Sequence, residues 1–296
     1  MLLAAAARRL QAAGVDAFEA DARTLMAHVL AVQPSRLLLL DTVDSASAER
    51  FGDLVERRAE RVPLQHLTGR AYFRHEQIQV GPGVFVPRPE TEVMTGWAVQ
   101  QLQRWRADGR VPLVVELCAG SGAIARSLAH EVPGAVVHAV EISEEAGRWA
   151  ALNLSGTTVE LHVADMATAL HELDGTVDLV VANPPYIPLD AYASVTPEVR
   201  DHDPLVALFS GEDGLDALRV VARVAARLLR VGGMVCAEHA EVQVESAPAV
   251  FLDAGAFSSV RDHQDLAGRP RFVTAVRAPT QTGVDHYVWQ DRPNER

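Results

Sequence analysis

Cysteine is scarce in this 296-residue chain, and its scarcity excludes two kinds of architecture. The two cysteines, Cys118 and Cys236, are too few and too far apart for a disulfide framework or a cysteine-based zinc site. The eleven histidines also lack a ligand spacing such as His-Glu-x-x-His, and the sequence predicts no metal site. This cysteine content is typical of proteins from a reducing compartment.

Long apolar runs are absent as well. No stretch approaches the roughly 20 apolar residues that a membrane-spanning helix needs. The apolar start, Met1 to Ala7, is followed by Arg8 and Arg9, whereas a secretory signal has its basic residues first. We therefore expect a cytoplasmic protein without a membrane partner.

Positive charge is in short supply, with 27 basic against 39 acidic residues and a net charge of -12. This balance opposes long-range attraction to phosphate backbones, so we expect no direct nucleic-acid substrate. The remaining composition is that of a globular protein, with 48% hydrophobic and 22% charged residues. A chain of this length and composition can bury a sizeable core.

The first part of the chain, residues 1 to about 68, has the apolar spacing of helices. Ser47 is the expected N-cap of a helix over Ala48 to Glu60. From Tyr72 to Val86 the pattern changes to alternation, which predicts a β-hairpin with its turn at Gly81-Pro82-Gly83.

The second part begins with a predicted helix over Glu90 to Arg106, after which short apolar strands alternate with helical segments. This alternation indicates an open, mostly parallel sheet with helices on both faces. The last two strands are separated only by a turn containing Gly268 and Pro270, so one edge of the sheet should be antiparallel. The expected strands are Leu113–Leu117, Ala135–Val140, Val159–Val163, Val177–Ala182, Met234–Ala237, Ser258–Val260 and Phe272–Val276.

A glycine-containing loop follows the first of these strands and comprises Cys118, Ala119, Gly120, Ser121 and Gly122. Small residues between a strand and a helix let a ligand approach the backbone. A tight turn that binds nothing, or a dinucleotide site, would show the same pattern.

The ends of the next two strands carry candidate cofactor contacts. Glu141 follows the second strand, where a carboxylate can accept both hydroxyls of a ribose. Asp165 follows the third strand and can accept from an adenine amino group, with Met166 packing on the ring. A helix cap is the alternative role for Asp165.

The fourth strand leads into Asn183, Pro184, Pro185 and Tyr186 at the edge where open α/β sheets bind ligands. The Asn183 side-chain oxygen and the Pro184 carbonyl can each accept one N–H of a planar NH₂ group. The prolines hold the backbone extended before substrate arrives, and the Tyr186 ring can stack on the group. The run predicts methyl transfer to the nitrogen of a conjugated amine or amide. This transfer needs no metal.

At these residues the chain resembles the release factor glutamine methyltransferase family. Two stretches, Pro63 to Arg70 and Phe85 to Glu92, are similar to that family's linker, and Asp265 to Arg269 is similar to its closing strands. The resemblance covers about residues 1 to 277. This chain departs from the family at Glu116, Cys118, Ala119 and Met166. At these positions the family has Asp, Gly, Thr and an aromatic residue, in that order.

The resemblance implies a class I S-adenosylmethionine methyltransferase fold, Rossmann-like, with a small N-terminal helical domain. It implies transfer of a methyl group from S-adenosylmethionine to the glutamine amide of the Gly-Gly-Gln motif in class I peptide chain release factors. The implied division is residues 1–70 for substrate docking, 71–92 for the hairpin linker, 93–278 for the methyltransferase domain and 279–296 for a tail. Two alternatives stay open: a nucleic-acid exocyclic-amine methyltransferase, and a binding module that has lost its cofactor.

Overall fold

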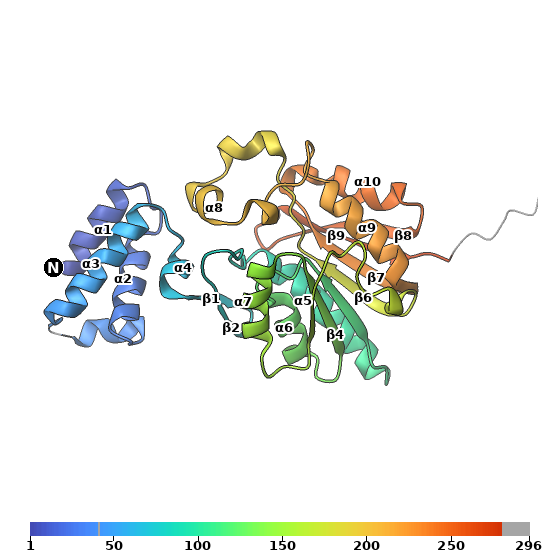
Figure 1. Cartoon of the computed structure of the whole chain (residues 1–296), viewed down its shortest axis with the longest axis horizontal. Coiled ribbons are helices and arrows are strands. Elements are labelled where there is room, and N and C mark those ends of the chain that lie inside the picture. Colours follow the sequence, from blue (N-terminus) through green and yellow to red (C-terminus); the bar gives the residue numbers. More distant parts are fainter. Residues whose placement is uncertain (41, 280–296) are drawn as a thin grey trace, which may run out of the picture.

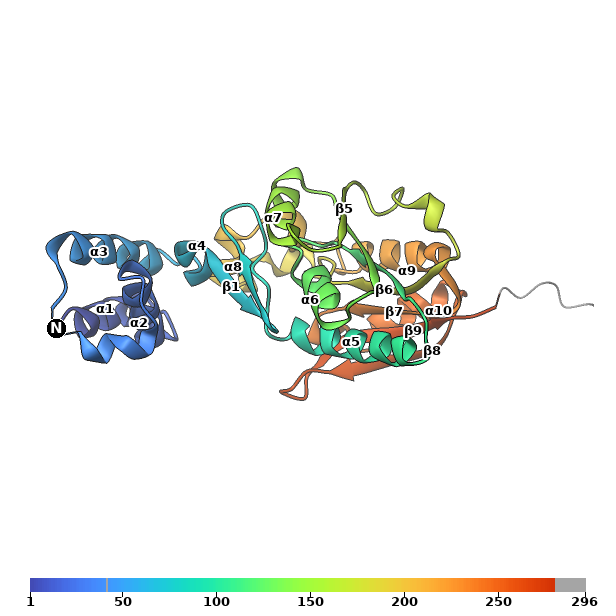
Figure 2. The ribbon, with the colours of Figure 1, turned by 90° about the horizontal axis from the view of Figure 1, so that it is seen from below.

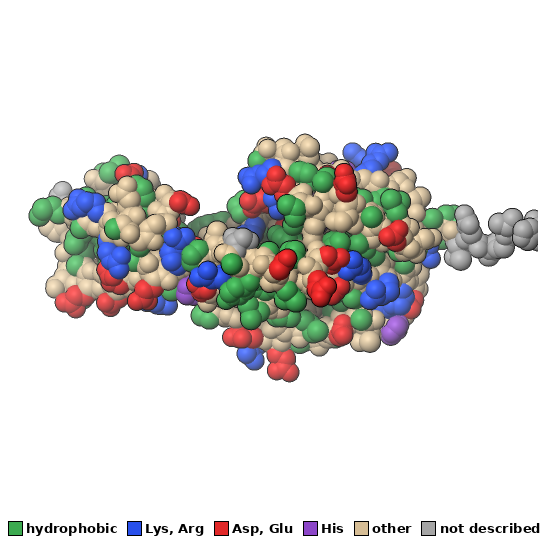
Figure 3. Space-filling model, turned by 90° about the horizontal axis from the view of Figure 1, so that it is seen from above, with side chains coloured by type: hydrophobic (Ala, Val, Ile, Leu, Met, Phe, Trp, Pro, Cys, Tyr) green, Lys and Arg blue, Asp and Glu red, His purple; other side chains and the backbone are tan. Residues whose placement is uncertain are grey.

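The computed structural model describes residues 1–40 and 42–279, and it forms a small helical lobe and a larger α/β lobe (Figures 1 and 3). Of the expected tail, residues 279–296, the part from residue 280 onward lies outside the described residues. Among the described helices, none combines the length and the apolar character that a membrane crossing requires.

The small lobe packs three helices around one apolar core, which includes Leu10, Leu25, Phe51 and Val55. The predicted helical character is confirmed, but the predicted cap at Ser47 is wrong. The N-cap is Asp44, whose carboxylate accepts the Ser47 backbone N–H at 2.9 Å and so begins the helix one turn earlier. The elements of this lobe are α1 (Leu2–Ala12), α2 (Phe18–Val29), the 3₁₀ helix η1 (Pro34–Leu39), α3 (Ser45–Ala59) and α4 (Leu64–Thr68).

A short hairpin, β1 (Arg70–Phe73) and β2 (Glu76–Gln79), lies between the two lobes (Figure 2). The sequence predicts a hairpin here, but its predicted turn at residues 81–83 is wrong, because the chain turns at Arg74 and His75. Arg74 adopts a φ of 52° without being glycine, and its Nη2 atom lies 2.6 Å from Oε2 of Glu131. This long-range ion pair holds a turn that local sequence does not mark.

The large lobe is a three-layer sandwich around a seven-stranded sheet of order β5-β4-β3-β6-β7-β9-β8. The five strands from β5 to β7 in this order are mutually parallel, while β9 pairs antiparallel with both β7 and β8, which confirms the expected mixed sheet. The strands are β3 (Leu113–Leu117), β4 (Val136–Glu141), β5 (Glu160–Val163), β6 (Val177–Ala182), β7 (Leu229–Glu238), β8 (Phe257–Gln264) and β9 (Pro270–Arg277).

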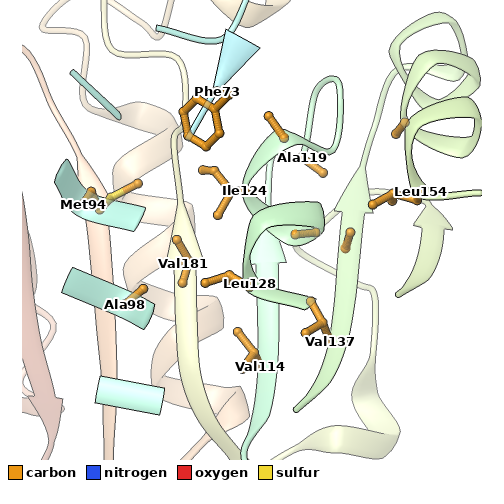
Figure 4. Packing of buried hydrophobic residues seen from close by; sticks show 14 of the residues in the cluster. Phe73, Met94, Ala98, Val114, Ala119, Ile124, Leu128, Val137, Leu154 and Val181 are labelled. Carbon is orange, nitrogen blue, oxygen red and sulfur yellow. The ribbon is translucent and has the colours of Figure 1, made fainter. Parts of the chain in front are cut away.

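Helices cover both faces of this sheet because its strands carry apolar side chains on both faces. One face packs against α5 (Thr91–Ala107), α6 (Ala123–Glu131) and α7 (Glu144–Leu154), and Phe73 of the hairpin joins this core beside Ile124 (Figure 4). The other face packs against α9 (Asp216–Leu228) and α10 (Ser246–Asp253).

The order of the strands reverses between β3 and β6, because the chain winds outward from β3 through β4 to β5 and then returns beside β3 as β6. Leu117 and Ala182, the last residues of β3 and β6, are register partners. The loops that follow them therefore open at the same switch point, where open α/β sheets bind ligands.

Candidate active site

A cavity of about 620 Å³ lies at the switch point, a volume typical of ligand pockets. Its walls come from the loops after β3, β4, β5 and β7, from the long connection between β6 and α9, and from the segment between β2 and α5. Gly122 does not line this cavity, whereas the other residues predicted for the site do: Cys118, Ala119, Gly120, Ser121, Glu141, Asp165, Met166, Asn183, Pro184, Pro185 and Tyr186.

The loop after β3 has the backbone shape that its glycines allow. Gly120 has a φ of 55°, and a Cβ added there would meet nothing within 4 Å, so its backbone faces open space. Gly122 has a φ of 78°, and a Cβ there would lie 3.1 Å from Leu154. Gly122 therefore permits close helix packing behind the wall, while Gly120 leaves room for a ligand.

Glu141 connects two of the loops through its carboxylate. Its Oε2 accepts the Gly120 N–H at 2.7 Å, and its Oε1 accepts the Ser143 N–H at 2.8 Å. An ionised carboxylate has about four acceptor positions, so about two remain after these bonds. They are suited to the two hydroxyls of a ribose.

Cys118 and Met166, which both depart from the resembled family, contact one another. The Cys118 Sγ lies 3.7 Å from the Met166 Sδ. Cys118 has a φ of 60°, a conformation that favours the glycine of the family pattern. The slender Met side chain in place of an aromatic ring leaves space that the Cys118 side chain can fill.

The environment of the Cys118 thiol disfavours the thiolate form. Burial raises its pKa, and the nearby carboxylates of Glu141 and Glu116 raise it further. Burial likewise raises the pKa of Glu116 to about 8, although the Ala125 N–H donates to its Oε2 at 2.8 Å. The alternative role of Asp165 as a helix cap is wrong, because a turn and not a helix follows it; its Oδ1 accepts the Ala167 N–H within that turn at 2.8 Å.

Asn183 is oriented by a residue that sequence reasoning missed. Its Nδ2 donates to Oγ1 of Thr91, at the start of α5, over 3.2 Å. Because the nitrogen is engaged, the Oδ1 atom is the part of the amide left to accept from a ligand. Thr91 is buried and precedes Asn183 by 92 residues, so no local pattern could have indicated the pair.

Tyr186 is held at both its hydroxyl and its backbone. The hydroxyl donates to Oε1 of Glu238 at 3.3 Å, and the carbonyl accepts from Nε2 of Gln243 at 3.1 Å. A Cβ at Gly214 would lie 2.3 Å from that carbonyl, so only glycine fits there. Burial raises the pKa of Glu238 to about 7, although a hydrogen bond with Thr91 and the positive charge of Arg271 each lower it.

The connection after Tyr186 forms an apolar wall above the pocket. It begins and ends at a bridge between Ile187 and Phe209 and contains η3 (Leu189–Ser194), α8 (Pro197–His202) and η4 (Leu205–Ala207). Arg88 Nη2 lies 2.8 Å from Oδ2 of Asp203, and burial raises the pKa of Asp203 to about 6 despite that charge. Glu198 of α8 pairs with Arg58 and Arg61 of the small lobe at 3.0 and 2.6 Å.

S-adenosylmethionine fits the residues of this pocket. The carboxylate of Glu141 retains acceptor positions, the backbone at Gly120 is open, and most of the lining is apolar. The parallel sheet, its switch point and this pocket define a class I S-adenosylmethionine-dependent methyltransferase.

Known proteins give the same class and a narrower family. A family model described as the PrmC N-terminal domain matches residues 1–69, and one described as a methyltransferase domain matches residues 114–202. A release factor glutamine methyltransferase from Streptomyces coelicolor is 50% identical over 93% of this chain and 97% of its own length. The chain therefore belongs to the release factor glutamine methyltransferase family.

Two further comparisons mark the breadth of this fold. A 4-amino-L-phenylalanine/4-methylamino-L-phenylalanine methyltransferase from Streptomyces pristinaespiralis is 44% identical over 84% of this chain and 86% of its own length. The crystal structure of the hMettl16 catalytic domain in complex with MAT2A 3'UTR hairpin 6 is 14% identical with a TM-score of 0.53, covering 70% of this chain and 77% of that one. At that identity the structural likeness concerns the fold alone.

Proposed function

We propose that this enzyme methylates the side-chain amide nitrogen of the glutamine in the Gly-Gly-Gln motif of class I peptide chain release factors. The observation that carries the proposal is the Thr91 contact, which leaves Oδ1 of Asn183 as an acceptor beside the Pro184 carbonyl. Two fixed acceptors match the two N–H groups of a primary amide. We also propose that an enzyme with this substrate is located in the cytoplasm.

Orientation is the main task of the site, because an amide nitrogen is a weak nucleophile whose lone pair is delocalised into its carbonyl. Asn183 and Pro184 hold the two N–H groups in fixed directions, which sets the direction of the nitrogen lone pair. Pro185 restricts the Pro184 backbone, and Tyr186 covers the amide and excludes water. Bound S-adenosylmethionine supplies an electrophilic methyl group on a positively charged sulfur.

The cofactor contacts follow from the pocket walls. We assign the loop from Cys118 to Gly122 to the cofactor backbone, Glu141 to the ribose hydroxyls, and Asp165 with Met166 to the adenine. The open backbone at Gly120 and the remaining acceptor positions of Glu141 support this assignment. The Asp165 contact to Ala167 engages one of its oxygens and leaves the other for the adenine amino group.

Substrate docking is assigned to the helical residues 1–70, joined by the linker 71–92 to the methyltransferase residues 93–278, with 279–296 as a tail. The ion pairs of Glu198 with Arg58 and Arg61 support this role. They connect the small lobe to the connection that lines the pocket. A protein bound on the small lobe would therefore contact the same unit that covers the reacting amide.

The test is product analysis by mass spectrometry after incubation with S-adenosylmethionine and a purified release factor. Methylation should appear on the Gly-Gly-Gln glutamine and vanish when that glutamine is replaced by alanine. A short Gly-Gly-Gln peptide should be a much poorer substrate, because it lacks the remote binding surface that orients the amide. Label on the alanine-substituted factor, or preferential label on RNA, DNA or 4-amino-L-phenylalanine, would overturn the proposal.

A further inference from the structure

Three side chains that commonly bind metal ions meet at the free edge of the sheet, although their sequence spacing indicated no site. His138 lies on β4, and Glu160 and His162 lie on β5. His138 is the register partner of Glu160, and Val140 is the partner of His162. Side chains alternate along strands, so all three project from the face opposite α5, α6 and α7.

The two imidazoles direct ring nitrogens at each other. Nδ1 of His138 lies 3.1 Å from Nε2 of His162. Nitrogens bound to one zinc ion at about 2.0 to 2.1 Å, with a tetrahedral angle between them, lie about 3.4 Å apart. The observed separation therefore needs to change by only a few tenths of an ångström to accommodate the ion.

The Glu160 carboxylate completes the cluster. One of its oxygens lies 3.7 Å from the His138 nitrogen, and the other lies 3.7 Å from the His162 nitrogen. The histidine side chains are 12% and 23% exposed, while that of Glu160 is 66% exposed. Two partly buried imidazoles and a carboxylate free to adjust form three ligands, and the open side admits water as a fourth.

A hydrogen bond between two neutral imidazoles explains the short nitrogen separation, but it does not explain a carboxylate that faces both nitrogens. We propose that His138, Glu160 and His162 form a binding site for a divalent transition metal ion, with Zn²⁺ as its reference ligand. Imidazole ligands favour zinc, nickel or copper over magnesium and calcium, which prefer oxygen ligands.

This site is separate from the methyl-transfer chemistry, but it uses the strands that carry the cofactor pocket. His138 precedes Glu141 by three residues on β4. His162, on β5, precedes Asp165 of the following loop by three residues. β5 is the edge strand of the sheet and pairs with β4. A bound ion cross-links this edge strand to its neighbour and stabilises the pocket wall.

The test is a calorimetric titration of the chelator-treated, tag-free full-length protein with Zn²⁺, in a buffer containing a reductant that does not bind metal. We expect one ion per chain with a dissociation constant of about 1 µM or lower, and a melting temperature that rises with zinc concentration. His162→Ala should weaken binding by at least about tenfold, as should the milder Glu160→Gln. His171→Ala is the matched control, because His171 also lies near a carboxylate, 3.5 Å from Asp174, but belongs to no three-ligand cluster among the residues that the structure describes.

Zinc binding of equal strength in wild type, His162→Ala and Glu160→Gln would place the ion elsewhere and overturn the site. Absence of wild-type binding below about 100 µM would overturn it as well. Circular dichroism of each variant checks folding, and Glu160→Gln keeps the test decisive if a histidine variant unfolds. Zinc affinity is measured without reference to methyl transfer, so this site and the proposed function fail independently.

Discussion

Replacing Thr91 with valine tests whether the orientation of Asn183 matters for catalysis. Valine has nearly the shape of threonine but no hydroxyl, so it removes the acceptor that lies 3.2 Å from Nδ2 of Asn183. The amide can then turn its NH₂ group toward the pocket. In that orientation it presents donors where the substrate amide needs an acceptor.

The size of the effect follows from the environment of the bond. Leaving a buried donor unpaired costs about 1 to 3 kcal/mol. Thr91 is buried, but Asn183 lines the cavity and retains some access to water, so the lower part of that range applies, about 1 to 2 kcal/mol. Each 1.36 kcal/mol is tenfold in rate, so kcat/KM for a release factor should fall roughly 5- to 30-fold.

Thr95→Val is the matched control, one turn later in α5. Thr95 is also buried, but its hydroxyl donates to the Thr91 carbonyl at 3.0 Å and does not contact Asn183. Steady-state methylation of a release factor would be measured for both variants, with S-adenosylmethionine affinity by calorimetry. Thr91→Val should lose turnover with unchanged cofactor affinity. Equal activity in the two variants would refute the orientation argument.

Four further predictions follow from the site. Asn183→Ala should lower kcat roughly 100- to 1000-fold while calorimetry shows unchanged cofactor affinity, and near-normal turnover would exclude its role as an acceptor. Glu141→Gln should weaken cofactor binding by roughly 1.5 to 3 kcal/mol, and an unchanged dissociation constant would assign the ribose to another residue. Because the pKa of Glu238 is raised from 4.5 to about 7 in the folded state, its contribution to stability is present at low pH and is lost as pH rises through that window. Glu238→Gln should therefore flatten the pH dependence of urea unfolding across that window, and a slope equal to that of wild type would contradict the shift. Glu198→Gln should raise KM for a whole release factor roughly 3- to 10-fold without changing KM for a short peptide. Asp201→Asn removes the same charge from α8 and should leave KM unchanged, because Asp201 pairs with neighbouring Arg200. Equal effects of these two variants on KM would show that the loss of negative charge, and not the ion pairs with Arg58 and Arg61, causes the change.

The sequence by itself determined most of the framework of the large lobe. β3 and β6 have the predicted bounds, because each is a mostly apolar run, interrupted only by Glu116 or Asp178, that is buried on both faces and followed by residues that stop a strand. That pattern is local, and so is the position of Asn183 at the end of β6. The antiparallel edge was likewise predictable from the short turn at Gly268.

Only the tertiary structure decided which side chains support the site. Thr91, Glu238 and Gln243 reach the Asn-Pro-Pro-Tyr run from three distant elements, and no spacing in the chain relates them to it. The hairpin turn at Arg74 depends on Glu131 in the same way.

The metal-ligand cluster shows the same division. His162 and Glu160 are two residues apart on one strand, a pattern too common to indicate a site. Strand register brings His138 beside them, and register is set by the packing of whole strands against helices. Local sequence specifies which residues form strands and turns, whereas contacts between distant residues depend on how the packed sheet aligns them.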